Sequence, residues 1–425
     1  MNNLYNIFLN STGITTDSRD CPKGSIFFAL KGETFDGNKY AASALEKGCS
    51  YAVVDEAEYA TDDRFILVPD VLTALQQLAN EHRRALGTRI IGVTGTNGKT
   101  TTKELIAAVL SKKYNVLYTQ GNFNNHIGVP KTLLRLTKEH EIAVVEMGAN
   151  HPGEIKTLVN IVEPDYGIIT NVGKAHLEGF GSFEGVIKTK GELYDFLRQK
   201  GGTKVFIDAD NEHLAGIAHD LEQIKYGVKS DAGTLAVKGE VIACDPFLRF
   251  RWNGGEVNTH LIGAYNIYNM LAAATIGMHF GVTPAQINEA LTEYVPSNNR
   301  SQLTVTENNK LVVDTYNANP TSMMAALENF TLMAMPSKMA ILGSMGELGA
   351  VSHDEHQRIV NYLTQHGYND VWLVGKEFGK IECNYRKFAD VEAVKQELLS
   401  HPLKDQCILI KGSNTMRLFE LPPLL

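Results

Sequence analysis

Cysteine and long apolar runs are scarce in this chain. Its five cysteines lie far apart, at positions 21, 49, 244, 383 and 407, and none belongs to a Cys-x-x-Cys pair. An odd number of widely spaced cysteines indicates reduced, structural thiols rather than a disulfide framework. No run approaches roughly 18 consecutive apolar residues, so we expect no membrane-spanning helix. The first residues lack a basic segment followed by a long apolar core, so we expect no secretory signal and a cytoplasmic protein.

Positive charge is not in excess either. Lys and Arg number 40 against 48 Asp and Glu, which gives a net charge of −8. This balance argues against a general nucleic-acid-binding surface, so we expect no nucleic-acid partner. The hydrophobic content of 44% is sufficient for packed cores. A chain of 425 residues is typical of about two to four domains.

The most informative motif is a glycine-rich run that follows a strand-like segment. Residues 89–93 are mostly apolar, and residues 102–110 carry apolar side chains at helical spacing. Between them stands Gly95-Thr96-Asn97-Gly98-Lys99-Thr100-Thr101. Strand, glycine-rich turn and helix together are the context of a phosphate-binding loop. Glycines let the backbone wrap around a polyphosphate, and the start of the helix presents free N–H groups to it.

Two side chains of this loop are predicted to act on a bound nucleotide. Lys99 would contact the β- and γ-phosphates, and the hydroxyl of Thr100 would bind Mg²⁺. The match to the general pattern is incomplete, because Val93 stands where a glycine is usual. A chance Gly-Lys-Thr sequence in a loop is the alternative, and the flanking strand and helix disfavour it.

The chain is predicted to form three domains, residues 1–86, 87–297 and 298–425. In the second, short apolar runs alternate with helical stretches, which predicts an α/β domain with a doubly wound, mostly parallel sheet. In the third, apolar runs end in glycine or a polar residue, as strands do where they deliver ligand-binding loops, and we expect a Rossmann-like domain. The stretch 294–299 is predicted to be the linker between them.

The expected strands are short and apolar. They are the runs 25–30, 51–54, 142–145, 166–169, 205–207, 339–343, 371–375 and 407–412. In the first segment, helices are expected near 40–48 and 71–86.

Polar side chains follow two of the expected central strands. Glu146 comes directly after the run 142–145, and His176 lies in a polar loop beyond the run 166–169. In a phosphate-loop enzyme, a carboxylate after a central strand is a natural second protein ligand for nucleotide-bound Mg²⁺. The alternatives are that Glu146 caps the next helix and that His176 is a solvated loop residue. Their placement after successive strands favours a shared crevice.

Several motifs along the chain form a specific combination. They are Gly95–Thr101, Gly121–Pro130, Glu146–Asn150, Ala175–Gly181, Lys190–Glu192, Asn266–Asn269, Asp314–Pro320 and Gly346–Gly349. On these motifs the chain resembles the Mur ligase family over nearly its whole length. The sequence Tyr-Asn-Ala-Asn-Pro at 316–320 favours the branch that adds D-alanyl-D-alanine, and the Asp-Asn-Pro-Arg motif of diaminopimelate-adding relatives is absent. Near the N-terminus, Thr16–Arg19 and Phe35–Gly37 resemble the domain that binds the UDP-sugar.

The resemblance implies an ATP-dependent ligase with the three-domain Mur ligase architecture. Its reaction would join D-alanyl-D-alanine to UDP-N-acetylmuramoyl-tripeptide through an acyl phosphate, in peptidoglycan precursor synthesis, and we expect a monomer. A Mur ligase that adds a single amino acid, a non-catalytic Mur-like binding protein and a simple NTP-hydrolysing switch are the alternatives. The third residue of the tripeptide, diaminopimelate or lysine, stays open.

The resemblance also implies where the catalytic groups lie. One Mg²⁺ held by Thr100 and Glu146, together with Lys99, would neutralise the β- and γ-phosphates. A second Mg²⁺ near His176 would bridge the γ-phosphate and the acyl oxygen. Lys190 matches the family lysine that CO₂ carbamylates, and the resulting carboxylate would bind this second Mg²⁺. From the residues alone, Lys190 would instead be an ordinary surface lysine on a helix.

Further residues are assigned to a ligand by the resemblance. ATP binding is implied for Gly95, Thr96, Asn97, Gly98, Lys99, Thr100, Thr101, Asn266, Asn269, Arg300 and Asp314. Substrate binding is implied for Ser18, Arg19, Asn124, Asn125, Asn317 and Asn319. Near the C-terminus, the residues expected to approach the dipeptide carboxylate are Lys411, Ser413 and Arg417. The alternatives are helix capping and packing by the two asparagines at 266 and 269, an interdomain ion pair in place of the ligand contacts of Arg300 and Asp314, and a structural partner for Arg19.

Overall fold

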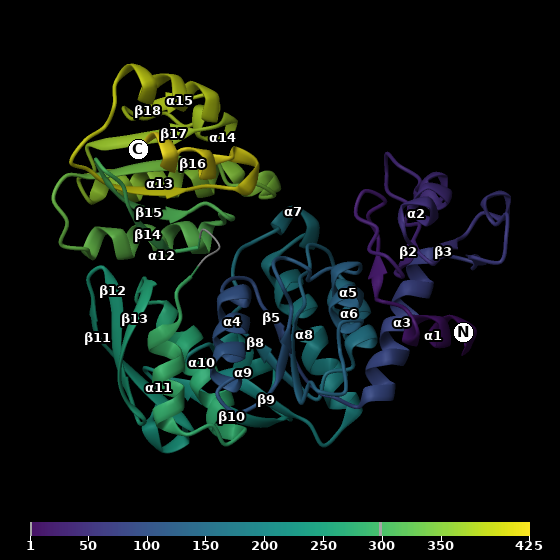
Figure 1. Ribbon diagram of the computed structural model, residues 1–425. Coiled ribbons are helices and arrows are strands. Elements are labelled where there is room, and N and C mark those ends of the chain that lie inside the picture. Colours follow the sequence, from purple (N-terminus) through teal and green to yellow (C-terminus); the bar gives the residue numbers. More distant parts are fainter. Residues whose placement is uncertain (1, 297–299) are drawn as a thin grey trace.

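Three β-sheets, each with helices packed on it, follow one another along the chain (Figure 1). The computed structural model describes residues 2–296 and 300–425. Of the linker predicted at 294–299, residues 297–299 lie outside the described residues. In Figure 1 the N-terminal unit (purple) stands beside one end of the central unit, and the C-terminal unit (green to yellow) lies over the other end. The predicted α/β class is confirmed.

The N-terminal sheet has four parallel strands in the order β1-β2-β3-β4. Their bounds are Ile14–Thr15 (β1), Ile26–Phe28 (β2), Tyr51–Val54 (β3) and Phe65–Leu67 (β4). Helix α2 (Ala41–Lys47) packs on one face, and α1 (Asn2–Leu9) and α3 (Val71–Leu86) pack on the other. Strands β2 and β3 are apolar because helices cover both of their faces.

The central sheet has nine strands in the order β13-β12-β11-β10-β9-β8-β5-β7-β6. Strands β5 to β11, which are neighbours in this sheet, are parallel, as predicted. Their bounds are Arg89–Thr94 (β5), Val116–Tyr118 (β6), Ile142–Glu146 (β7), Tyr166–Ile169 (β8), Lys204–Asp208 (β9), Glu222–Gly227 (β10) and Val237–Cys244 (β11). Two antiparallel strands extend it, β12 (Phe247–Trp252) and β13 (Gly255–Ile262). The sequence analysis did not single these two out.

Two layers of helices sandwich the central sheet. Their bounds are Lys99–Leu110 (α4), Gly128–Leu133 (α5), Glu154–Val162 (α6), Leu177–Phe180 (α7), Phe183–Lys200 (α8), Glu212–Ile217 (α9), Asn266–His279 (α10) and Pro284–Glu293 (α11). Helices α5, α6 and α8 bury one face, and α4, α10 and α11 bury the other. This doubly wound arrangement places the loops after the parallel strands at one edge.

The C-terminal sheet has six strands in the order β14-β15-β19-β16-β17-β18, with β14 antiparallel to β15 and the other pairs parallel. The strand bounds are Gln302–Val305 (β14), Lys310–Asp314 (β15), Lys338–Gly343 (β16), Asp370–Val374 (β17), Arg386–Phe388 (β18) and Cys407–Lys411 (β19). The helix bounds are Pro320–Leu332 (α12), Ser352–Gln365 (α13), Lys376–Gly379 (α14) and Val391–Ser400 (α15). Helices α12 to α14 cover one face and α15 covers the other.

Short 3₁₀ turns complete the described structure. They span Gly37–Tyr40, Ala57–Tyr59, Ala232–Thr234, Gly349–Val351, Asn414–Met416, Leu418–Glu420 and Pro422–Leu424. Across residues 2–296 and 300–425, no helix has both the length and the apolar character that a bilayer crossing requires.

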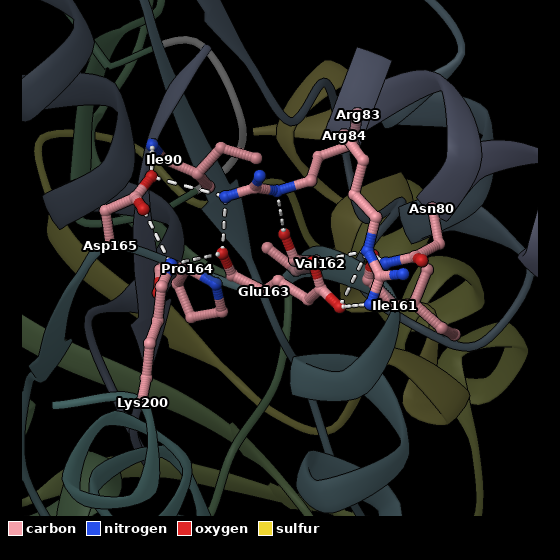
Figure 2. A network of polar contacts seen from close by, with 10 residues as sticks. All are labelled: Asn80, Arg83, Arg84, Ile90, Ile161, Val162, Glu163, Pro164, Asp165 and Lys200. Carbon is pink, nitrogen blue, oxygen red and sulfur yellow. Dashed lines mark hydrogen bonds and ion pairs between the residues drawn. The ribbon is translucent and has the colours of Figure 1, made fainter. Parts of the chain in front are cut away.

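Helix α3 joins the N-terminal unit to the central unit through a shared core. Leu75 and Leu78 are buried in the same apolar cluster as Phe28 of the N-terminal sheet and Leu158 of α6. Polar contacts reinforce this junction at the C-terminal end of α6 (Figure 2). There the Arg83 guanidinium donates to Val162 O (2.8 Å), to Glu163 O (2.6 Å) and to Asp165 (3.3 Å).

Two neighbours of Arg83 extend the same network (Figure 2). Arg84 pairs with the Glu163 carboxylate, and Asn80 donates to Ile161 O at 2.9 Å. A guanidinium at the last carbonyls of a helix is favourable, because these carbonyls lack partners within the helix and carry the negative end of its dipole. Helix α3 is therefore fixed to the central unit by apolar packing and by charge.

Candidate active site

The phosphate-binding loop lies between β5 and α4, as predicted, and two glycines shape it. Gly95 (φ +143°) and Gly98 (φ +77°) adopt a backbone conformation that residues with a side chain rarely adopt. A Cβ on Gly95 would lie 2.0 Å from Thr170 Oγ1, and a Cβ on Gly98 would lie 2.7 Å from Asn269 Oδ1. Both positions therefore require glycine.

Neighbouring loops fix the backbone of this loop at Asn97. Thr170 Oγ1 and Asn171 Nδ2 donate to Asn97 O at 2.7 and 3.0 Å, and Asn97 N donates to Asn171 Oδ1 at 3.0 Å. Asn319 Nδ2, from the C-terminal unit, donates to Asn97 Oδ1 at 2.8 Å. The C-terminal unit thus contacts the phosphate-binding loop directly.

Lys99 is the first residue of α4, and its side chain folds back over the loop. Its Nζ donates to Gly95 O at 2.8 Å and to Thr96 O at 3.0 Å. Burial lowers the pKa of Lys99 to about 8, although Glu146 opposes the shift. An anionic phosphate beside this amine would raise the pKa again and favour the ammonium form.

Glu146 lies at the end of β7, only 1% exposed, and its carboxylate faces the loop. Thr100 Oγ1 donates to its two oxygens at 3.2 and 3.0 Å, and Asn124 Nδ2 donates to Oε1 at 2.8 Å. The alternative that Glu146 caps the next helix is wrong, because Gly153 is the N-cap of α6. Thr100 and Glu146 thus place oxygen atoms side by side that could bind a metal ion.

Lys103 lies one turn beyond Lys99 on α4, and the sequence analysis did not single it out. It is fully buried, and within the described ranges its Nζ has no hydrogen-bond partner. The amine lies 4.0 Å from Glu146 Oε2 and 3.7 Å from Glu104 Oε1. Burial lowers the pKa of Lys103, and the two carboxylates oppose this shift. A lysine four residues after Lys99 on a largely apolar helix was the signal available in the sequence.

His176 follows β8 and reaches toward the C-terminal unit. Its Nδ1 pairs with Oε2 of Glu347, and its backbone is left-handed (φ +50°). Burial lowers the pKa of His176, and Glu347 opposes this shift. A solvated loop residue is therefore the wrong description of His176.

Lys190 lies inside the protein, on α8. It is 2% exposed, whereas Lys188 is exposed, so the surface-lysine alternative is wrong for Lys190. Its Nζ donates to Ala149 O at 3.2 Å and lies 5.2 Å from the centre of the Phe180 ring. Burial lowers the pKa of Lys190 well below its usual value, and nearby Lys99 lowers it further. Burial thus favours the neutral amine over the ammonium form at Lys190.

A cavity of about 900 Å³ opens where the carboxyl ends of the central strands meet the C-terminal unit. The predicted residues that line it are Thr96, Asn97, Gly98, Lys99, Thr100, Thr101, Asn124, Asn125, Glu146, His176, Asn266, Asn269, Arg300, Asp314, Asn317 and Asn319. Lys411 lines it too. Four other predicted residues do not line the cavity: Gly95, Lys190, Ser413 and Arg417. Of these, Lys190 donates to the backbone oxygen of Ala149, and Ala149 does line the cavity. The crevice expected from the strand ends is present.

Charged groups of the C-terminal unit enter this cavity. The Arg300 guanidinium stacks over the Tyr316 ring at 3.6 Å from its centre, and Lys411 Nζ donates to Asp314 Oδ2 at 2.5 Å. Lys411 also donates to Asn317 O at 3.2 Å. Asp314 is thus paired within its own unit, with Lys411 on the neighbouring strand β19, and not in the interdomain ion pair considered as the alternative.

Two asparagines of α10 form one end of the cavity. Asn269 Oδ1 accepts from Thr102 Oγ1 at 3.0 Å, and Asn269 Nδ2 donates to Asn266 Oδ1 at 2.8 Å. Asp208, which the sequence analysis missed, lines the same cavity at the end of β9. Burial raises the pKa of Asp208 to about 7. Its position directly after a central strand, like that of Glu146, was the missed signal.

Two predicted substrate residues lie outside the cavity, on the N-terminal unit. Arg19 pairs with Asp17 at 2.7 Å and its side chain is 87% exposed, so the structural pairing considered for it is present. The backbone oxygen of Ser18 accepts from Lys47 Nζ at 2.7 Å. Asn125, in contrast, lines the cavity, and its Oδ1 accepts from Gly128 N, at the start of α5, at 2.8 Å.

Similarity to known protein families covers most of the chain. Residues 10–83 match the family model described as Mur ligase family, catalytic domain. Residues 93–277 match Mur ligase middle domain, and residues 299–414 match Mur ligase, glutamate ligase domain.

Similar proteins of known name align along nearly the full length. The UDP-N-acetylmuramoyl-tripeptide–D-alanyl-D-alanine ligases of Bacillus subtilis (strain 168) and Escherichia coli (strain K12) are 36% and 35% identical to this chain. Each alignment covers 96% of this chain and 92% of the relative.

Two solved structures have the same arrangement of all three sheets. MurF from Acinetobacter baumannii superposes with a TM-score of 0.86 at 30% identity, over 96% of this chain and 92% of that one. The MurF ligase from Thermotoga maritima, solved in complex with ADP, gives a TM-score of 0.86 at 26% identity, over 98% and 97%.

Proposed function

Because this chain belongs to the Mur ligase family, we propose that it is the ligase that uses ATP to join D-alanyl-D-alanine to UDP-N-acetylmuramoyl-tripeptide. The observation that carries the proposal is the convergence of the phosphate-binding loop, the Glu146 carboxylate and the cations Arg300 and Lys411 on one cavity. The reaction brings the anionic phosphates of ATP to an anionic carboxylate, and fixed cations offset their repulsion.

Two chemical steps follow from this assignment. An oxygen of the tripeptide carboxylate attacks the γ-phosphorus, the bond to ADP breaks, and an acyl phosphate forms. The amine of D-alanyl-D-alanine then attacks the acyl carbon, and a tetrahedral intermediate collapses to the amide with loss of phosphate and a proton. The loop N–H groups and Lys99 would hold the transferring phosphoryl group.

The oxygen donors beside the loop fit a Mg²⁺ ion. Thr100 Oγ1 and the Glu146 carboxylate are hard ligands 3.0–3.2 Å apart, and Glu146 is buried with Lys103 as its nearest cation at 4.0 Å. A bound Mg²⁺ would neutralise charge on the β- and γ-phosphates. Within the described residues no three His, Cys, Asp or Glu side chains cluster closely enough to hold a metal. Thr100 and Glu146 would therefore share the ion with phosphate oxygens.

The second ligand set would be built on Lys190 and His176. An ammonium at Lys190 would repel a cation, so the unmodified charged side chain does not fit. Burial lowers the pKa of Lys190 and so favours its neutral amine, which would attack CO₂, form an N–C bond, release a proton and yield a carbamate. That carboxylate and the ring of His176 would face the same ion. Imidazole is a less usual Mg²⁺ ligand than oxygen, so His176 is the weaker member.

The remaining assignments divide the substrates among three domains, 1–86, 87–297 and 298–425. The first would bind the UDP-sugar, with Ser18 and Arg19 near it. The second would bind ATP, and its Asn269 would contact the adenine edge. The third would contribute Arg300 and Asp314 to the nucleotide, and its Asn317 and Asn319 to the incoming dipeptide. We further propose a monomeric, cytoplasmic enzyme, since its substrates are cytoplasmic precursors.

The test is ATP turnover with each UDP-N-acetylmuramoyl-tripeptide, ending in diaminopimelate or in lysine, with and without D-alanyl-D-alanine. We expect pentapeptide and ADP in equal amounts, and only in the presence of the dipeptide. Joining of free diaminopimelate or lysine to the dipeptide precursor would assign a different Mur ligase activity. ATP hydrolysis that needs no amine acceptor would favour an NTP-hydrolysing switch, and binding without turnover would favour a non-catalytic relative.

A further inference from the structure

The Gly346–Gly349 motif belongs to the C-terminal unit, and one of its residues reaches a side chain of the central unit. It lies between β16 and α13, and Glu347 extends from it to His176. The contact is double, because Glu347 O also accepts from Glu178 N at 3.1 Å. Both side chain and backbone of Glu347 thus hold the loop that carries His176.

The pairing decides which nitrogen of the imidazole faces the site. An Nδ1–H that donates to the Glu347 carboxylate leaves Nε2 with its lone pair free. In water, neutral histidine favours the opposite tautomer, with the proton on Nε2. Histidines that bind metals commonly donate their second ring N–H to a carboxylate, which fixes the tautomer and orients the ring. This pairing therefore holds His176 in the tautomer with a free lone pair on Nε2. That nitrogen can accept a hydrogen bond or bind a metal ion.

The backbone indicates that this geometry is imposed from outside the loop. His176 (φ +50°) and Glu347 (φ +60°) are both left-handed without being glycine. Such conformations are uncommon and persist where surrounding contacts determine them. Here the nearby contacts are Lys174 Nζ with Glu355 at 2.8 Å and Lys174 N with Thr321 Oγ1 at 3.2 Å.

We infer that Glu347 is a positioning residue, which fixes the tautomer and orientation of His176 only when the C-terminal unit is docked on the central unit. The inference rests on the proposed function for the role of His176, but the geometry behind it does not. Docking and catalytic competence would then be coupled: the ring is oriented when the unit that supplies Arg300, Asp314 and Lys411 is also in place.

The experiment reads the tautomer directly, in protein without ATP or metal. Long-range ¹H–¹⁵N correlation spectra of histidine-labelled protein distinguish a protonated ring nitrogen from an unprotonated one, and the His176→Gln variant identifies the His176 signals. We expect protonated Nδ1 and unprotonated Nε2 in the wild type. Glu347→Ala should move the equilibrium toward protonated Nε2. The matched control is Glu178→Gln, which removes an exposed carboxylate from the same loop and should leave the His176 signals in place.

Kinetics supply the second readout. Glu347→Ala should lower kcat about tenfold while KM for ATP changes less than about twofold, because the nucleotide contacts are untouched. His176 signals unchanged in Glu347→Ala would overturn the inference, whatever the activity. If that variant does not fold, Glu347→Leu, which keeps the bulk of the exposed side chain but removes the acceptor, serves with the same spectra: a displaced His176 signal supports the inference, and an undisplaced one overturns it. Because the spectra need no substrate, this inference and the proposed function can fail independently.

Discussion

The central unit contacts the N-terminal unit and the C-terminal unit through different kinds of interaction. On the N-terminal side, α3 buries Leu75 and Leu78 in a core shared with the central helices, and Arg83 holds the end of α6. On the C-terminal side, the contacts near the cavity are polar pairs, such as Asn319 with Asn97 and Lys174 with Glu355. The described apolar contact there is small: Ile262, with Phe247 packed against it, joins the C-terminal core.

The difference has an energetic consequence. Each buried leucine in a shared core contributes roughly 2 kcal/mol, so the N-terminal junction resists separation. Partly exposed polar pairs contribute about 0–1 kcal/mol each, so we expect the C-terminal junction to separate more easily than the N-terminal one. The cavity lies at the second junction. We therefore expect substitutions at the C-terminal junction to change the rate of the reaction. Substitutions at the N-terminal junction should instead change the free energy of unfolding.

The largest expected effect is at the cavity. Lys99→Ala should reduce pentapeptide formation about 10³-fold, because one preorganised cation at the transferring phosphate is lost. Circular dichroism and the denaturation midpoint should match the wild type. Lys112→Ala, just beyond the end of the same helix, is the control and should stay within about twofold. Near-normal activity of Lys99→Ala would contradict the phosphate-loop assignment.

Lys190→Ala is expected to reduce the rate about 10²-fold or more, since it removes the proposed carbamate ligand. Acetate should partly restore activity by occupying the vacated volume with a carboxylate. Lys188→Ala, two positions earlier and exposed, should be mild. A high-resolution map should show planar density on the Lys190 amine. A bare ammonium there, in active protein supplied with CO₂, would exclude the modification.

At the other junction, Arg83→Ala should lower the free energy of unfolding by about 2–4 kcal/mol, because carbonyls at the end of α6 and the Asp165 carboxylate lose a largely buried partner. Urea denaturation measures this. Arg64→Ala breaks the exposed pair with Asp62 and should leave the denaturation midpoint nearly unchanged. Equal decreases in the free energy of unfolding of the two variants would show that the Arg83 network does not stabilise this junction.

The smallest expected effect is a pH dependence of stability that arises from Asp208. Its pKa is raised to about 7 in the folded protein, so between pH 4 and 7 the folded state binds a proton that the unfolded state releases. Stability should therefore fall as pH rises through this window, by on the order of 2 kcal/mol. Asp208→Asn should flatten the dependence when denaturation midpoints are compared at pH 5 and 8. An unchanged slope would exclude Asp208 as its source.

Local signals made the phosphate-binding loop predictable. Strand, glycines and helix are contiguous in sequence, and Gly95 and Gly98 are required by backbone conformation and close approach. Glu146 was predictable for a similar reason, because parallel strands end at one edge of the sheet. Asp208 ends a central strand in the same way, so the same signal marks it in the sequence.

Contacts between distant segments were not predictable. Glu347 pairs with a histidine 171 positions away, and Lys411 pairs with Asp314 across 97 positions. Nothing in the local pattern around either residue specifies its partner, because the docking of two units decides the first pair and the pairing of β15 with β19 decides the second. The antiparallel strand β12 also escaped prediction, although its alternation of buried and exposed residues over Phe247–Trp252 is typical of a strand with one solvated face.

The contrast between the junctions is tested most directly by the initial rate of pentapeptide formation by Arg83→Ala. The rate should be measured with saturating substrates, at a temperature where circular dichroism shows the variant folded. We predict a rate within about twofold of the wild type, despite the lower free energy of unfolding, because no cavity group has moved. A loss of tenfold or more in folded protein would contradict the separation of stability from chemistry at the two junctions.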